Sequence, residues 1–208
     1  MPLENTVTAE IAATAARLVV EDGMEYGPAK QRALKVLGLS QRMGKGRAAL
    51  PSNDELEDEV RDYLALFCAD TQPGELRALR ELAAVWMERL AEFRPHLGGA
   101  VWRGTATRLS NIHLQLFCDD SKSAEIALIN WQVDYEVGAT NGPRGQPVDV
   151  LSLAAPCRAL GEQVTVHLSI LDFDDLRGAL KPDARGRSER GDLAALKKRL
   201  AEEELPDE

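Results

Sequence analysis

Hydrophobic residues recur at helical spacing through the first part of the chain. The apolar positions of its first segment, Ile11, Ala15 and Leu18, fall on one face of a helix. The same spacing continues, and it predicts four amphipathic helices, over residues 8–22, 28–37, 52–67 and 73–94. Ser52 and Glu55 carry the signature of a capping box at the start of the third helix. We therefore expect residues 1–95 to form a helical N-terminal region, a small bundle.

The pattern changes from helical spacing to alternation after residue 96. Apolar and polar residues alternate, or β-branched residues dominate, in four stretches, which predict strands over residues 111–118, 125–137, 147–156 and 164–171. A short helix after Asp172 and a final helix over residues 193–204 complete the chain. The fold class expected is α+β, with the helical region followed by a small mixed or antiparallel sheet and flanking helices.

Composition and charge narrow the class of protein. The chain has 208 residues, 44% hydrophobic and 28% charged, as is usual for a globular protein, and its net charge is −9. This charge disfavours non-specific binding of nucleic acid by the whole surface. The first residues lack the basic start and apolar core of a signal peptide, and no apolar run reaches the ~20 residues that cross a bilayer. With three widely spaced cysteines, we expect a cytoplasmic protein with reduced thiols and no membrane contact.

One segment departs from this acidic average. Residues 26–53 contain no acid and six basic residues, Lys30, Arg32, Lys35, Arg42, Lys45 and Arg47. Such a segment is able to hold the phosphates of a nucleotide, RNA or DNA with salt-sensitive affinity. The alternative is structural: the basic segment neutralises the acidic helix that begins at Ser52, within the chain or across a homo-oligomer. The sequence leaves both hypotheses open.

Candidate chemistry gathers in residues 98–120, where a Gly-Gly pair precedes an alternating strand. Because a strand has a period of two, Asn111, His113 and Gln115 share one face, opposite an apolar face that should meet a core. The glycines lack a Cβ and so allow a ligand to approach the backbone closely. A polar strand face beside a glycine turn predicts a binding site.

This arrangement resembles the polymerase-beta-like nucleotidyltransferase superfamily over residues 80–170. The family's motif is a Gly-Ser or Gly-Gly pair followed by a strand that reads Ser-Asp-x-Asp; here Gly98–Gly99 and then Ser110–His113 stand in those places. The family's two metal-binding carboxylates correspond to Asn111 and His113. Its third acid has no clear counterpart, since the later strand VTVHLSI offers His167 and Ser169.

The resemblance implies roles for particular residues. Ligand binding falls to Gly98, Gly99, Arg103, Arg108 and Ser110, and the catalytic positions are held by Asn111, His113 and His167. Two-metal transfer needs anionic oxygens that clamp both ions, and magnesium prefers hard oxygen ligands. We therefore expect residues 96–208 to be a nucleotidyltransferase-like domain that has lost transfer activity. It would need no cofactor and act as a binding or regulatory module for a nucleotide, nucleic acid or protein.

Two further hypotheses use other groups of the same region. An active nucleotidyltransferase would need magnesium and displaced acids such as Asp119, Asp120 and Asp134, although the first two are also ordinary turn residues after a strand. If the strands that carry His113 and His167 are neighbours, the two imidazoles approach each other and are able to bind a transition metal.

Overall fold

The computed structural model of the chain describes residues 2–39, 50–179 and 186–203. The chain folds into two compact units, Met1–Pro73 and Gly74–Glu208. Each unit has its own hydrophobic core. In the described ranges, no helix is both long and apolar enough to span a membrane.

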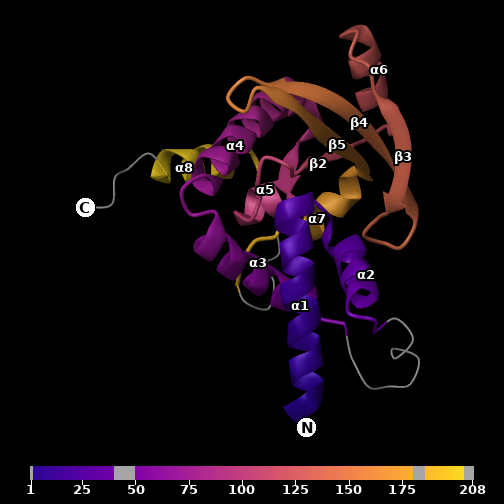
Figure 1. The fold of residues 1–208 in the computed structure, drawn as a ribbon. Helices are drawn as coiled ribbons and strands as arrows, with labels where there is room; N and C mark the ends of the chain where they lie inside the picture. Colours follow the sequence, from indigo (N-terminus) through magenta and orange to yellow (C-terminus); the bar gives the residue numbers. More distant parts are fainter. Residues whose placement is uncertain (1, 40–49, 180–185, 204–208) are drawn as a thin grey trace. The chain divides into compact units, whose positions relative to one another are not determined.

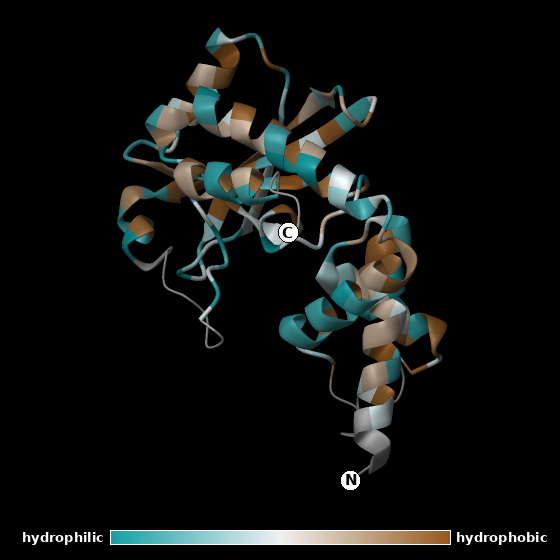
Figure 2. Ribbon diagram, turned by 90° about the vertical axis from the view of Figure 1, so that its left-hand side faces the viewer, coloured by the Kyte–Doolittle hydropathy of each residue, from teal (hydrophilic) through white to brown (hydrophobic). Residues whose placement is uncertain are grey.

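The first unit contains the helices α1 (Pro2–Asp22), α2 (Tyr26–Val36) and α3 (Asn53–Phe67), labelled in Figure 1. α1 packs against both of the others, and the core takes buried residues from all three. The predicted capping box forms: Glu55 N donates to Ser52 Oγ at 3.1 Å and Ser52 N donates to Glu55 Oε2 at 2.7 Å. Figure 2 shows hydrophobic and hydrophilic residues alternating along these helices, as expected where one face is buried.

The second unit is built on a five-stranded mixed sheet. Its strands are β1 (His96–Gly98), β2 (Ile112–Cys118), β3 (Glu136–Asn141), β4 (Pro147–Cys157) and β5 (Glu162–Asp172). The helical elements are α4 (Gln72–Arg89), η2 (Ala91–Phe93), α5 (Gly99–Arg103), α6 (Ser123–Asn130), η3 (Phe173–Asp175), α7 (Leu176–Ala179) and α8 (Leu193–Glu202). The fold class is therefore α+β with an N-terminal helical region, as the sequence predicts.

The strand order in the sheet is β1-β2-β5-β4-β3. β2 and β5 run parallel, and the other neighbouring pairs are antiparallel. β3, β4 and β5 are joined by hairpin connections, whereas the path from β2 to its parallel neighbour passes through α6, β3 and β4. Two strands distant in sequence thus lie side by side at the centre of the sheet.

The two faces of the sheet differ in polarity. On one face, Ile112, Leu114 and Leu116 of β2 are fully buried, together with Val166 and Leu168 of β5. This face belongs to the same core as the apolar residues of α4. Because successive strand residues point to opposite faces, the polar residues of β2 and β5 share the other face, where they are half-buried.

The structure corrects the prediction of one strand over residues 125–137. α6 occupies the first part of this stretch, and β3 begins at Glu136. Ala124, Ala127 and Leu128 are buried, and their spacing of three and four residues suits a helix that packs by one face. The β-branched and aromatic residues that favoured a strand therefore divide between a helix, a turn and a shorter strand.

Other differences concern the ends of elements. α4 ends at Arg89 and a short 3-10 turn follows, so the helix predicted to reach Arg94 is shorter. α4 also shares the core of the sheet, and the two compact units divide near residue 73. β1 and α5 have no counterpart in the sequence prediction, because each is too short to show a period.

Candidate functional site

All three histidines of the chain lie on the polar face of the sheet. His113 of β2 is directly opposite His167 of β5, and His96 of β1 is opposite Gln115 of β2. Residues directly opposite each other on paired strands share a face. His113 and Gln115 are two residues apart on β2, so they share it too. Strand register alone therefore gathers these side chains, from three strands, on one surface.

His113 and His167 form the centre of this surface. Their rings stack with centroids 5.0 Å apart and planes inclined by 29°. Ser152 Oγ, from β4, lies 2.8 Å from His167 Nδ1 and so fixes the orientation of that ring. The strands are thus neighbours and the two imidazoles do approach each other. Across the described ranges, however, no group of three or more His, Cys, Asp or Glu residues is placed to hold a metal ion.

The glycine pair lies against this stack. Gly98 is opposite His113 on the neighbouring strand. Gly99 has a φ of +68°, and a Cβ built on it would lie 3.3 Å from His113 Cδ2. Both the left-handed backbone and the close contact favour glycine at this position. The structure therefore brings together Gly98, Gly99, His113 and His167, four of the residues selected from the sequence.

A fifth group on this surface, Arg190, is not among the residues selected from the sequence. Its guanidinium is largely buried and donates a hydrogen bond to Gln115 Oε1. Its nearest carboxylate, that of Glu189, is 3.9 Å away and mostly exposed. Burial lowers the pKa of Arg190 from its ordinary value. Arg190 stands among other arginines in a loop sequence, and nothing in that pattern distinguishes it; only the fold places it beside the sheet.

A buried tryptophan supports the glycine pair from α5. Trp102 is 3% exposed, and its Nε1 donates to Ser188 O at 2.7 Å. Gly191 lies directly against the ring and exchanges backbone hydrogen bonds of 2.8 and 3.0 Å with Leu97 of β1. The segment that carries Arg190 is therefore attached both to β1 and to the helix that follows the glycines.

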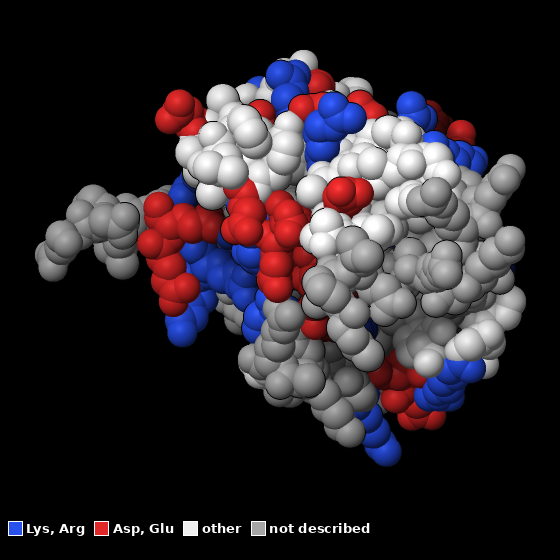
Figure 3. All heavy atoms as spheres, turned by 60° about the horizontal axis from the view of Figure 1, so that its bottom comes forward, with Lys and Arg blue, Asp and Glu red and all other residues white. Residues whose placement is uncertain are grey.

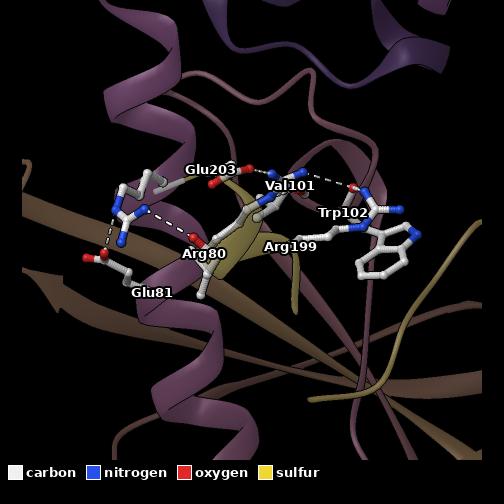
Figure 4. A network of polar contacts seen from close by, with 8 residues as sticks. Arg80, Glu81, Val101, Trp102, Arg199 and Glu203 are labelled. Atoms are coloured by element: carbon white, nitrogen blue, oxygen red, sulfur yellow. Dashed lines mark hydrogen bonds and ion pairs between the residues drawn. The ribbon is translucent and has the colours of Figure 1, made fainter. Parts of the chain in front are cut away.

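Two arginines fix the end of α5, as Figure 4 shows. Arg80 of α4 is buried and donates to Val101 O at 3.0 Å and to Trp102 O at 3.2 Å, and it forms an ion pair with Glu203. Arg199 of α8 donates to Trp102 O at 2.7 Å and lies 3.6 Å above the Trp102 ring. Burial and the charge of Arg199 lower the pKa of Arg80 to about 10. α4, α5 and α8 are thereby joined beside the site.

Several other residues selected from the sequence have structural partners. Arg108 donates to both carboxylate oxygens of Glu162, at 3.2 and 3.1 Å, and these hydrogen bonds and the Glu162 charge raise the pKa of Arg108. Ser110 Oγ accepts a hydrogen bond from Thr107 N at 3.0 Å within a turn. Arg103, half-buried, is the last residue of α5. These contacts account for the position of Arg108 and Ser110 without a ligand.

The acids after β2 lie in a turn. Asp119 is exposed, with Oδ2 3.8 Å from Arg94 Nη1. Asp120 Oδ1 accepts a hydrogen bond from Lys122 N at 3.0 Å, as turn-forming aspartates do. Asn111, half-buried, directly precedes β2. The turn function proposed as an alternative for the two aspartates is thus consistent with their contacts.

The basic residues of the 26–53 segment that the structure describes divide into two groups. Lys30 is buried, and its Nζ donates to Pro51 O and to Asn53 Oδ1, each at 2.7 Å, which joins α2 to the start of α3. Burial lowers the pKa of Lys30. Arg32 and Lys35 are exposed. Arg42, Lys45 and Arg47 lie outside the described residues. On the face drawn in Figure 3, basic and acidic side chains are both present and in places adjoin one another.

Comparison of the chain with protein-family models, with curated proteins and with solved structures found no match.

Proposed function

We propose that residues 74–208 form a nucleotidyltransferase-like module that binds an anionic ligand, a nucleotide, on the polar face of the sheet and does not catalyse metal-dependent transfer. The observation that carries the proposal is the contact between Gly99 and His113, with His167 in register beside it. The glycine pair is thus next to His113, one of the two positions at which the resemblance requires metal-binding acids.

The chemistry of these side chains does not fit a pair of magnesium ions. Such a site needs anionic oxygens that hold both ions. Asn111 offers a neutral carbonyl oxygen, and His113 and His167 offer nitrogen, which suits transition metals better. The donor set of this surface therefore supports binding without the transfer reaction.

The same surface carries groups that suit an anion. Arg190 is a largely buried cation whose contact on the sheet is the neutral amide of Gln115. A phosphate placed over Gln115 would gain a charge-assisted hydrogen bond from this guanidinium, which is already largely shielded from water. Ser152 and the histidines provide further hydrogen-bonding groups beside it. The protein is proposed to act in the cytoplasm, where its three free thiols stay reduced.

Calorimetric titration of the full chain with ATP, GTP, CTP and UTP, each with and without magnesium, tests the proposal. We expect binding of at least one nucleotide, with an affinity that magnesium does not increase. Arg190→Gln should weaken that binding by about tenfold or more, because one charge-assisted hydrogen bond is lost. Absence of binding by all four nucleotides would contradict the proposal. Incubation with radiolabelled nucleotides and magnesium would contradict it as well, if label were transferred from any of them to an acceptor.

A variant whose nucleotide binding becomes dependent on magnesium would test the resemblance to the nucleotidyltransferase superfamily. The double variant N111D/H113D restores the Asp-x-Asp spacing of the family on β2. If the site corresponds to that of the family, nucleotide binding by this variant should become stronger in magnesium. Thr165→Asp is the control, because it adds a carboxylate to the same face of β5 away from the positions that the resemblance assigns to metal-binding acids. Equal magnesium responses of the two variants would show that the positions do not correspond.

A further inference from the structure

One face of α2 in the first unit is hollowed and carries positive charge. A cavity of about 610 Å³ lies there, lined by the apolar side chains of Met24, Pro28 and Val36 and by Gln31, Arg32 and Lys35. Val36 is 58% exposed, although it is a large hydrophobic residue. The structure records no ion pair for Arg32 or Lys35 within the described part of the chain. The surface is thus an apolar floor with two cations beside it.

α3 of the same unit carries the opposite pattern. Glu59, Asp62 and Leu66 are spaced three and four residues apart, so they lie along one side of the helix. Leu66 is 76% exposed and the adjacent Phe67 is 69% exposed. Glu59 and Asp62, like the two cations of α2, have no recorded ion pair among the described residues. This surface combines two carboxylates with two large apolar side chains in water.

We propose that a second copy of the chain binds at this cavity through its α3. Glu59 and Asp62 of one copy lie against Arg32 and Lys35 of the other, and Leu66 with Phe67 covers the apolar floor of the cavity. At about 610 Å³ the cavity has room for these side chains, since one water molecule takes about 30 Å³. Because each copy has both surfaces, two copies related by a two-fold axis make the contact twice.

The lining of the cavity favours a protein helix over a nucleic acid. A phosphate backbone would pair with Arg32 and Lys35 but would leave Met24, Pro28 and Val36 in water. An acidic helix with apolar side chains satisfies both parts of the surface. The chain's net charge of −9 also disfavours a polyanion as partner, whereas it leaves a local pairing of opposite patches intact.

Sedimentation velocity of the full chain tests this contact. The fraction of dimer should rise with protein concentration. The association constant should fall by about tenfold or more between roughly 50 and 500 mM salt, because exposed charges are screened. The variants R32E/K35E and E59K/D62K should each lose self-association. R158E/K198E is the matched control: it changes the net charge as much as R32E/K35E does, at exposed positions of the second unit that belong to neither surface.

Mixing the two charge-reversed variants gives the decisive result. Acidic α2 of one variant then faces basic α3 of the other, so the mixture should associate although neither component does alone. Circular dichroism of each variant checks its fold, and Leu66→Asn provides a second disruption that leaves the charges unchanged. A chain that stays monomeric at all concentrations, or a mixture that does not associate, would overturn the proposal. Loss of binding to a single-stranded RNA in R32E/K35E, with a monomeric parent, would instead identify a nucleic-acid surface.

Discussion

Of the glycines that the structure describes, Gly191 leaves the least room for a side chain. A Cβ built on this residue would lie 2.1, 2.4 and 2.6 Å from three atoms of the Trp102 ring. The ring cannot move freely, because its Nε1 is bonded to Ser188 O and Arg199 lies 3.6 Å above it. The Gly191 backbone is held as well, by two hydrogen bonds to Leu97.

The magnitude follows from these contacts. Overpacking in a close-packed interior costs about 1–3 kcal/mol, and loss of one hydrogen bond adds about 1 kcal/mol. Gly191→Ala should therefore lower the free energy of unfolding of this unit by about 2–4 kcal/mol. Urea denaturation followed by tryptophan fluorescence is the assay, because Trp86, Trp102 and Trp131 all lie in residues 74–208 and report on this unit.

A double-mutant cycle separates the steric effect from other causes. Trp102→Phe shortens the ring system, so the destabilisation by Gly191→Ala should be smaller in its presence than in the parent, by about 1 kcal/mol or more. Gly138→Ala in β3 is the control, since the nearest atom to its added Cβ is 3.9 Å away. An unchanged urea midpoint for Gly191→Ala, or the same loss with either side chain at position 102, would refute the steric argument.

Three further results are expected. Gly99→Ala should destabilise the second unit by about 1–2 kcal/mol in the same assay, because φ is +68° and the new Cβ meets an imidazole. Arg80→Met should lower the free energy of unfolding by about 2–4 kcal/mol and Glu203→Gln by less, because the arginine is buried while the glutamate is about one-third exposed. Equal losses in the two variants would contradict this reasoning. Burial raises the pKa of Cys118 to about 11, so a thiol reagent near pH 8 should modify Cys68 well before Cys118. The Cys118 thiol ionises at lower pH in the unfolded chain than in the folded one, so its contribution to stability is complete below about pH 9 and falls as the pH rises toward 11. Alkylation rates followed by mass spectrometry check the reactivity, and urea midpoints between about pH 8 and 11 check the stability.

Features that depend on neighbouring residues could be predicted from the sequence. The capping box at Ser52 forms as expected, because its two hydrogen bonds join residues three positions apart. The alternation in β2 and β5 correctly separates a buried face from a polar one, because the period of a strand is local. Where local signals conflict, as in residues 125–137, the packing of Ala127 and Leu128 decided in favour of a helix.

The residues of the candidate site also divide into those that local sequence patterns indicate and those whose contacts depend on the fold. The sequence indicated Gly98, Gly99, His113 and His167 separately, through a glycine pair and two alternating strands. It also indicated Arg108, which the fold pairs with Glu162 from β5. No local pattern shows that a guanidinium already has a carboxylate partner far along the chain, because that pairing depends on which strands lie side by side.

By itself, the sequence determined most of the helices, most of the strands and the side of β2 and β5 that faces the core, since these follow from the periods of a helix and a strand. Only the tertiary structure decided that β5 lies beside β2 in the register that stacks His167 on His113, and that Arg190 reaches Gln115. The physical reason is that strand pairing and loop position are selected by the burial of a shared apolar face. Residues far apart in the chain contribute to that face together.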